Sequence, residues 1–349
     1  MKTVFGHQKF REGQKEVIQN LIMKKNTLAI FPTGAGKSIC FQLASKIFKG
    51  LVIVVAPLLS LIQDQVDSMS NMPLTVRRYD STLKKHEKDM IINELVKSKV
   101  NILYVSPEGL GNTLLRDIIA KHNRVSLVAV DEAHCVDEWG PFFRVNYMKL
   151  AKNIKLVNAE RVLLLTATTQ DHTVKVFRET FNIAEVVKTE FLRKNLQIII
   201  NQKPNHSKEI LEDIINNLEM RYPGLTLIYV IRRRDAEEVA NVLQEKGFKV
   251  MGYHGGMPYE KRKTVQEWFG KSVDGIVVAT TAFGMGINIP NIRYVYHYHI
   301  PMTVQTYTQQ IGRGGRDGQP TICEAYFNQD SVSIAKTLIF CIFDLFFYF

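Results

Sequence analysis

Cysteine is scarce in this sequence, and the few cysteines lie far apart. Four occur among 349 residues, at positions 40, 135, 323 and 341. No two have the C-x-x-C spacing of a zinc knuckle, and four scattered thiols do not make a disulfide framework. We therefore expect a protein of a reducing, intracellular compartment. The sequence does not distinguish cytoplasm or nucleoid from nucleus.

Long apolar stretches are also rare. The first twenty residues carry charges at Lys2, Lys9 and Arg11 and have no apolar segment, so we expect no signal peptide. The longest apolar stretch, residues 338–349, is too short for a membrane span and is interrupted by Asp344. We expect no membrane partner. Residues 336–349 form an apolar tail of unknown role, which packs on the second domain, binds a partner or marks a truncated reading frame.

Acidic residues are fewer than basic ones. Lys and Arg number 45 against 34 Asp and Glu, which gives a net charge of +11. This excess favours a polyanionic partner such as nucleic acid, although a merely basic surface would fit equally well. Hydrophobic residues make up 46% and charged residues 23%, which excludes disordered, collagen-like and coiled-coil chains. The length predicts roughly two domains.

Short β-branched runs recur along the chain, each followed by a stretch with helical character. Continuous apolar strands that alternate with helices predict parallel sheets covered on both faces. We expect two α/β domains, at residues 1–190 and 191–335, with the boundary in the aperiodic segment between residues 187 and 207. The expected strands are residues 27–31, 51–56, 101–106, 126–130, 162–166, 225–231, 275–280, 292–297 and 322–327.

The sequence TLAIFPTGAGKS, residues 27–38, has the order strand, glycine-rich turn and helix start that is typical of a P-loop. Backbone N–H groups of such a loop and the helix N-terminus bind phosphate oxygens. Phe31 stands where the strict pattern has glycine, and a chance glycine-rich turn is the alternative. The expected nucleotide-binding residues are Thr33, Gly34, Ala35, Gly36, Lys37 and Ser38, with Lys37 on the β- and γ-phosphates and Ser38 on Mg²⁺.

Two further segments carry chemistry that suits nucleotide hydrolysis. Asp131 and Glu132 follow an apolar strand, where Asp131 would hold the Mg²⁺ shell and Glu132 would deprotonate water. An Asp-Glu helix cap is the alternative. Arg313 and Arg316, spaced by glycines, suit an anion clamp and are predicted arginine fingers, supplied across a domain interface to the γ-phosphate. A basic surface turn is the alternative.

Eight motifs follow one another along the chain: FGHQKFREGQ (5–14), TGAGKS (33–38), APLLSLIQDQ (56–65), DEAH (131–134), HCVDEWGPFFR (134–144), TAT (166–168), ATTAFGMGINIP (279–290) and QQIGRGGR (309–316). Their order resembles a superfamily 2 helicase and, more narrowly, the RecQ family of ATP-dependent DNA helicases. The resemblance covers about residues 5–327.

The resemblance implies two RecA-like domains of the P-loop NTPase type, with ATP and Mg²⁺ in the cleft between them. It implies 3′ to 5′ movement on single-stranded DNA, unwinding of duplex DNA, and a role in DNA repair or recombination. Gln14 would read adenine, supported by Arg11, and His7 stands where the family has a larger ring that stacks on the base. The resemblance assigns coupling and cleft roles to His134, Thr166, Thr168 and Gln309.

DNA contact is expected in the aromatic segment after the carboxylates. Rings that stack on bases and cations that follow phosphates grip DNA without reading its sequence. The predicted contacts are Trp139, Phe143 and Arg144; core packing is the alternative, and it is favoured for Phe142 or Phe143 taken alone. Pro141 and Phe142 replace the family's usual His-Asp.

The family often continues into a four-cysteine zinc module and a winged helix, and we expect no such zinc site here, because Cys323 and Cys341 cannot form one. We therefore expect strand separation to be weak or to need a protein partner that supplies them. Two alternative functions stay open from the sequence: an ATP-binding, nucleic-acid-binding regulator with little turnover, and an RNA helicase of the same superfamily.

Overall fold

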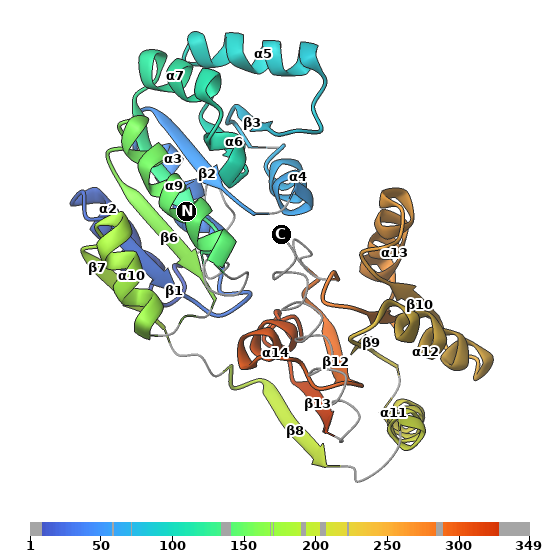
Figure 1. The fold of residues 1–349 in the computed structure, drawn as a ribbon. Coiled ribbons are helices and arrows are strands. Elements are labelled where there is room, and N and C mark those ends of the chain that lie inside the picture. The colour runs from blue at the N-terminus through green and yellow to red at the C-terminus, as the bar shows by residue number, and fades with distance from the viewer. Residues whose placement is uncertain are drawn as a thin grey trace. The chain divides into compact units, whose positions relative to one another are not determined.

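The computed structural model describes residues 9–57, 59–70, 72–133, 141–167, 169, 171–189, 193–202, 207–221, 223–283 and 289–327. Residues 141–148 are described by their backbone alone. The chain divides into two compact units, Met1–Phe191 and Leu192–Phe349, and each is described by itself (Figure 1).

The first unit is built on a seven-stranded sheet in which every pair of neighbours is parallel. Its order is β3-β4-β2-β5-β6-β1-β7, so β6 lies between β1 and β5. The strands are β1 (Thr27–Ile30), β2 (Leu51–Val55), β3 (Val76–Tyr79), β4 (Ile102–Val105), β5 (Val125–Val130), β6 (Val162–Thr166) and β7 (Glu185–Lys188).

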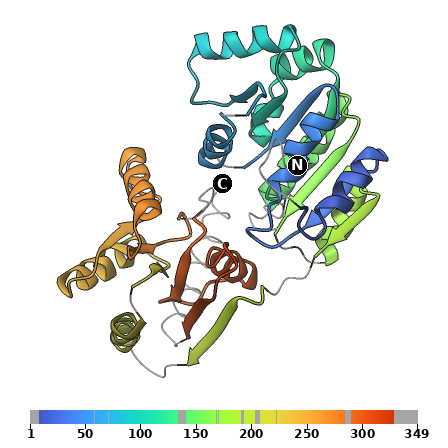
Figure 2. The same cartoon turned by 180° about the vertical axis from the view of Figure 1, so that it is seen from behind.

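Helices cover both faces of this sheet because its central strands are apolar on both sides. In β2, Val52 and Val54 pack with α2, α3 and α4, whereas Leu51, Ile53 and Val55 pack with α5, α7, α9 and α10. Figures 1 and 2 show these helices on the two sides of the sheet. The helices are α2 (Gln14–Ile22), α3 (Ser38–Ile47), α4 (Leu59–Ser68), α5 (Lys85–Val96), α6 (Pro107–Leu110), α7 (Thr113–His122), α9 (Pro141–Leu156) and α10 (Asp171–Phe181).

The second unit repeats this plan with a six-stranded parallel sheet of order β10-β11-β9-β12-β13-β8. One face packs on α11 and α12, and the other packs on α13 and α14. The strands are β8 (Leu196–Gln202), β9 (Leu225–Tyr229), β10 (Val250–Tyr253), β11 (Ile276–Ala279), β12 (Ile292–His297) and β13 (Thr321–Phe327). The helices are α11 (Ser207–Arg221), α12 (Arg233–Glu245), α13 (Tyr259–Lys271) and α14 (Val304–Ile311).

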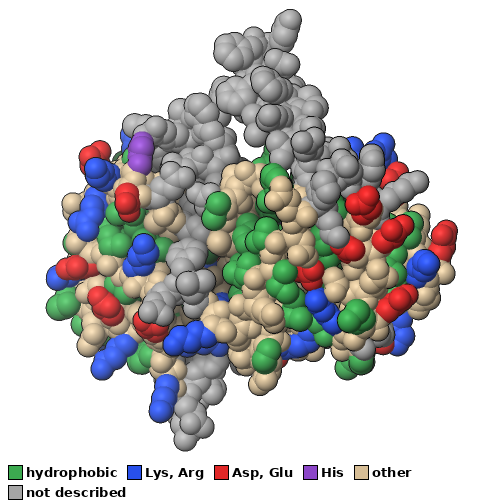
Figure 3. Space-filling view, turned by 90° about the horizontal axis from the view of Figure 1, so that it is seen from below, with side chains coloured by type: hydrophobic (Ala, Val, Ile, Leu, Met, Phe, Trp, Pro, Cys, Tyr) green, Lys and Arg blue, Asp and Glu red, His purple; other side chains and the backbone are tan. Residues whose placement is uncertain are grey.

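The prediction of two α/β domains with parallel sheets is confirmed, and each of the nine expected strands forms within two residues of its expected bounds. The sequence analysis missed four strands, β3, β7, β8 and β10, which are the outer strands of the two sheets. Of these, β8 lies inside the segment that we expected to be aperiodic. Its Ile198 and Ile200 are 42% and 57% exposed, and the face in Figure 3 shows hydrophobic side chains exposed between charged ones.

Within the described part of the chain, no helix is long and apolar enough to cross a membrane. The described cysteines, Cys40 and Cys323, are buried free thiols, and burial raises the pKa of each to about 12. The predicted apolar tail and the other two cysteines lie outside the described residues.

Candidate active site

The glycine-rich segment forms a turn between β1 and α3, as a P-loop requires. The amide of Phe31 extends the β1–β6 pairing with a 3.0 Å bond to the carbonyl oxygen of Thr166. Gly34 and Gly36 then take φ values of 83° and 80°, which L side chains rarely adopt, and α3 begins at Ser38. The loop therefore ends at a helix N-terminus, which favours bound phosphate.

Phe31 serves the core rather than the loop. Its ring is fully buried in the cluster with α2, α3 and α4. A Cβ atom at Gly13, where φ is 75°, would lie 2.6 Å from the Phe31 ring. The large residue at the strict pattern's glycine position is therefore accommodated by a glycine at the start of α2.

The segment that leads into α2 is bonded to the P-loop. Nε2 of the buried Gln14 side chain donates to the carbonyl oxygens of Ala35, at 3.0 Å, and Gly36, at 3.1 Å. The guanidinium of Arg11 donates to the carbonyl oxygen of Gly34, and the Arg11 amide donates to Oε1 of Gln14 at 2.9 Å. Arg11 and Gln14 thus act as a collar on the loop, a contact that the sequence motif did not reveal.

The carboxylates follow β5, one strand away from the P-loop strand. Asp131 is buried, and its carboxylate accepts a 3.0 Å bond from the Glu132 amide. Burial and the neighbouring Glu132 charge raise the pKa of Asp131 to about 7, while Lys37 opposes that rise. Glu132 has a φ of 48°, which is unusual for a side chain other than glycine and is typical of strained functional positions.

These residues fit a magnesium ion. Mg²⁺ prefers carboxylate, hydroxyl, water and phosphate oxygens, and Asp131 and Ser38 supply the first two kinds. Lys37 alone does not offset the burial and the Glu132 charge that raise the pKa of Asp131 above its ordinary value of 3.8. A divalent cation beside the carboxylate would add positive charge and lower that pKa. Among the described residues no group of three or more His, Cys, Asp or Glu side chains is arranged to hold a metal ion, and the remaining ligands of Mg²⁺ would be phosphate and water.

The predicted arginine fingers lie in residues 312–318, here termed the arginine turn, which directly follows α14. Burial raises the pKa of the Tyr229 hydroxyl, and two nearby arginines oppose that rise. Arg313 acts through its charge and a hydrogen bond to the hydroxyl, and Arg316 acts through its charge. Gln309 lies in α14. The arginine turn therefore presents its cations beside the end of β9.

Sequence reasoning missed Tyr229. The side chain is buried at the end of β9 and stacks on His297, with ring centroids 5.4 Å apart. His297 is fully buried, and its Nε2 lies 2.9 Å from Oε1 of Gln310 in α14. A polar aromatic residue at the end of a central strand was the available signal, but in the sequence it looks like any other core tyrosine.

Several predicted site residues cannot be placed. His7, His134, Trp139 and Thr168 lie outside the described residues, and Phe143 and Arg144 belong to the backbone-only part of α9. Thr166 is the buried last residue of β6. The DNA-contact segment therefore remains a prediction, whereas the P-loop, the two carboxylates and the collar are brought together within the first unit.

The fold and these motifs define the class. Residues 11–177 match the model of the DEAD/DEAH box helicase family, and residues 202–318 match that of the helicase conserved C-terminal domain. Two solved helicases share the fold: Mss116 bound to single-stranded RNA (19% identity, TM-score 0.72, covering 92% of this chain and 70% of that one) and MrfA bound to DNA (17%, TM-score 0.75, 93% and 47%). The chain has the two RecA-like domains of a helicase core.

Curated relatives give the family. The chain is 35% identical over 322 residues to the ATP-dependent DNA helicase RecQ of Pasteurella multocida, which covers 92% of this chain and 50% of that protein. It is 33% identical to the probable ATP-dependent DNA helicase RecS of Bacillus subtilis, covering 91% and 64%. The chain belongs to the RecQ family and spans about half to two thirds of the length of these relatives. The predicted family resemblance is confirmed.

Proposed function

We propose that this chain is the motor core of an ATP-dependent DNA helicase. It hydrolyses ATP with Mg²⁺, moves 3′ to 5′ on single-stranded DNA and separates duplex DNA, in DNA repair or recombination. The observation that carries the proposal is the P-loop beside the Asp131–Glu132 pair, where Lys37 acts electrostatically on a buried carboxylate. That combination suits hydrolysis of a nucleoside triphosphate.

Each residue has a definite task in this proposal. The loop amides and Lys37 bind the phosphates, and Ser38 and Asp131 hold Mg²⁺, which neutralises phosphate charge when bound. Glu132 orients and deprotonates the attacking water. Arg313 and Arg316 stabilise the charge on the transferred phosphoryl group, and Gln309 joins them there. His134, Thr166 and Thr168 couple hydrolysis to the second domain.

Base recognition and DNA contact complete the proposal. Gln14 reads the adenine with support from Arg11, and His7 takes the position of the stacking ring. The bonds from Arg11 and Gln14 to the P-loop link that recognition to the phosphates. Trp139, Phe143 and Arg144 contact single-stranded DNA by stacking and phosphate pairing. A protein partner contributes to strand separation.

The choice of DNA over RNA depends on the relatives. The shared fold occurs in a helicase bound to RNA and in one bound to DNA, so the fold alone favours neither. The relatives in the RecQ family are named as DNA helicases. Comparing ATPase stimulation by single-stranded DNA and RNA of one sequence tests this choice.

The test of the proposed function is steady-state ATPase activity with Mg²⁺, with and without single-stranded DNA. We expect strong stimulation by DNA in the wild type and loss of turnover in Glu132→Gln, since the amide cannot accept the proton from water. Glu132→Gln should still bind ATP, because the P-loop is unchanged. Binding of ATP and DNA without turnover in the wild type would instead support a regulator.

A further inference from the structure

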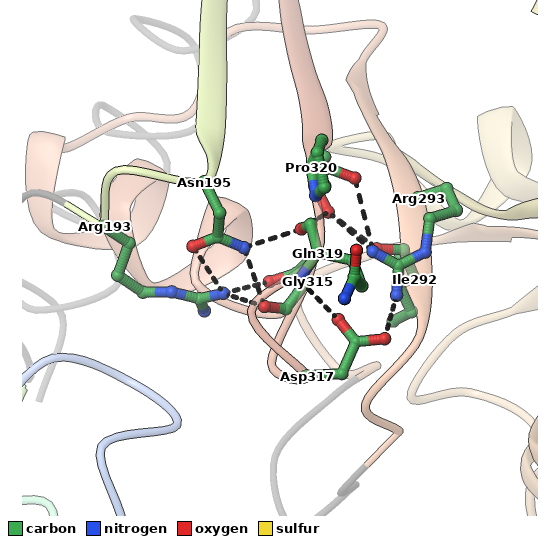
Figure 4. A network of polar contacts seen from close by, with 10 residues as sticks. Arg193, Asn195, Ile292, Arg293, Gly315, Asp317, Gln319 and Pro320 are labelled. Carbon is green, nitrogen blue, oxygen red and sulfur yellow. Dashed lines mark hydrogen bonds and ion pairs between the residues drawn. The ribbon is translucent and has the colours of Figure 1, made fainter. Parts of the chain in front are cut away.

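The arginine turn is held by a side chain from the start of the second unit. Arg193 precedes β8 and lies more than a hundred residues before the turn in the sequence. Its Nη1 donates to the carbonyl oxygen of Gly312 at 3.1 Å, and its Nη2 donates to that of Gly314 at 2.8 Å. Nη2 also donates to the carbonyl oxygen of Gly315 (Figure 4). One guanidinium thus donates hydrogen bonds to three backbone carbonyl oxygens of the turn.

A second side chain continues this contact. Nδ2 of Asn195 donates to the carbonyl oxygens of Gly315, at 2.9 Å, and Gln319, at 2.8 Å (Figure 4). The backbone carbonyl oxygen of Asn195 accepts a 2.9 Å bond from the Thr321 amide, which begins the pairing of β13 with β8. The turn and the outer strand are therefore fixed by the same few residues.

The carbonyls that Arg193 binds are the ones that bracket the predicted fingers. Gly312 and Gly314 directly precede and follow Arg313, and Gly315 directly precedes Arg316. Gly312 also ends α14, where carbonyl groups lack helical partners and a cation is favoured. A guanidinium suits this position because its donors are spread over a rigid plane, whereas a lysine ammonium is a point charge.

Glycine is required for this close approach. Gly315 has a φ of 51°, and a Cβ atom there would lie 2.5 Å from Nδ2 of Asn195. The opposite side of the turn is bonded to β12, where the Gly315 amide donates to the Ile292 carbonyl oxygen at 2.9 Å and Arg293 pairs with Asp317 (Figure 4). The turn is consequently fixed from two strands, but the backbone on either side of Arg313 is held by Arg193.

We propose that Arg193, supported by Asn195, is a positioning residue that aims Arg313 and Arg316 at the transferred phosphoryl group. This inference rests on the proposed function, because positioning of Arg313 and Arg316 by Arg193 matters only if these two arginines act in ATP hydrolysis. Loss of the guanidinium leaves the ATP-binding P-loop intact and lets the fingers shift. A displacement of about 1 Å at a catalytic group lowers a rate by roughly a hundredfold.

The first experiment measures DNA-stimulated ATPase activity of wild type, Arg193→Met and Asn195→Asp. We expect kcat to fall about 10- to 100-fold in Arg193→Met, with the KM for ATP within about threefold of wild type, since binding and positioning separate. Asn195→Asp should lower kcat as well, because it replaces a donor with an acceptor that faces two carbonyl oxygens. The kcat of Arg193→Lys should lie between those of the wild type and Arg193→Met.

The matched control is Arg221→Met. Arg221 lies in the same unit and pairs with the buried Glu324 at 2.7 Å, on a different part of the sheet. We expect it to lower the melting temperature while kcat per folded molecule stays at the wild-type value. Assays are run at a temperature where circular dichroism shows every variant folded.

A double-mutant cycle with Arg316→Ala separates positioning from general loss of structure. If Arg193 acts through the fingers, adding Arg193→Met to Arg316→Ala lowers kcat far less than it does in the wild type. Losses that multiply in full, or a wild-type kcat in folded Arg193→Met, overturn the inference while the proposed function stands. A wild type without any DNA-stimulated ATPase activity overturns the proposed function and the inference with it.

Discussion

Asp131 illustrates, at the scale of single residues, how a buried charge marks the nucleotide site. Its carboxylate has a raised pKa because burial and the neighbouring Glu132 disfavour its charge, and Lys37, at the start of α3, opposes that rise. The motifs predicted that these residues share one site. Their mutual electrostatic effect depends on β6 separating β1 from β5, which only the fold determines.

Arg316→Ala tests the finger assignment. If Arg316 is an arginine finger, the substitution removes a cation from the transferred phosphoryl group and leaves the P-loop unchanged, so turnover should fall by about 10³ while ATP affinity stays near the wild-type value. Steady-state kinetics and titration with a fluorescent ATP analogue measure the two quantities. Lys37→Ala is the comparison, since it should abolish hydrolysis, and an Arg316→Ala variant with normal turnover would contradict the assignment.

We predict that His297 gives the second unit a pH-dependent stability. Burial lowers its pKa from the ordinary 6.5 to about 4, opposed by the contact with Gln310. Between pH 6.5 and about pH 4, His297 is protonated in the unfolded chain but neutral in the native protein. Stability that is present above pH 6.5 is therefore lost as the pH falls, by about 2 kcal/mol at pH 5.

His297→Phe removes this titration and keeps an aromatic ring beside Tyr229. Urea unfolding at pH 7.5 and pH 5 measures the free energy of unfolding of both proteins. We expect the difference between the two pH values to be about 2 kcal/mol smaller in the variant. An equal loss in both proteins would show that other groups cause the acid sensitivity.

At the scale of secondary structure, position in the sheet explains what the sequence could and could not predict. The nine predicted strands are inner strands, which pair with a neighbour on each side. Apolar runs such as LVIVV in β2 are completely buried. The four missed strands are outer ones with mixed sequences such as VRRY in β3 and EVVK in β7. Charged residues on outer strands protect against edge pairing and remove the apolar signal.

The same reasoning applies to the site. The P-loop and the carboxylates are contiguous motifs, so the sequence predicts them. Arg193 and Tyr229 contact the arginine turn only because β8 and β9 lie in the same sheet as β12 and β13. Contacts between residues so distant in the chain have no local pattern that would reveal them.

Two isoleucines of the second sheet test the effect of strand position. Ile228 in β9 is fully buried, whereas Ile200 in β8 is 57% exposed. Ile228→Ala should lower the free energy of unfolding by about 2–5 kcal/mol, because it leaves a cavity. Ile200→Ala should cost no more than about 1 kcal/mol. Urea unfolding measures both, and similar costs would mean that Ile200 is buried in solution by a partner or by another part of the chain.

At the scale of the whole molecule, the net charge of +11 becomes meaningful once a family of DNA helicases is established. A motor that moves along DNA must bind every sequence with similar affinity, so most of its binding free energy has to come from phosphates and stacked bases. Lys and Arg residues that neutralise phosphates release counterions, which couples affinity to salt concentration. The salt dependence of DNA affinity is therefore a measurable link between the basic composition of the chain and its proposed function.

The affinity for single-stranded DNA should accordingly fall steeply with salt and change little with sequence. For Z phosphate contacts, the logarithm of the binding constant should fall with the logarithm of salt concentration with a slope of about −0.7Z. Fluorescence anisotropy with labelled oligonucleotides of several sequences, between low and physiological salt, measures this slope. The Lys37→Ala variant is the control, because its substitution lies in the P-loop and should leave the slope unchanged. A flat salt response, or strong preference for one sequence, would mean that DNA is bound through base contacts, which a translocating motor would have to break at every step.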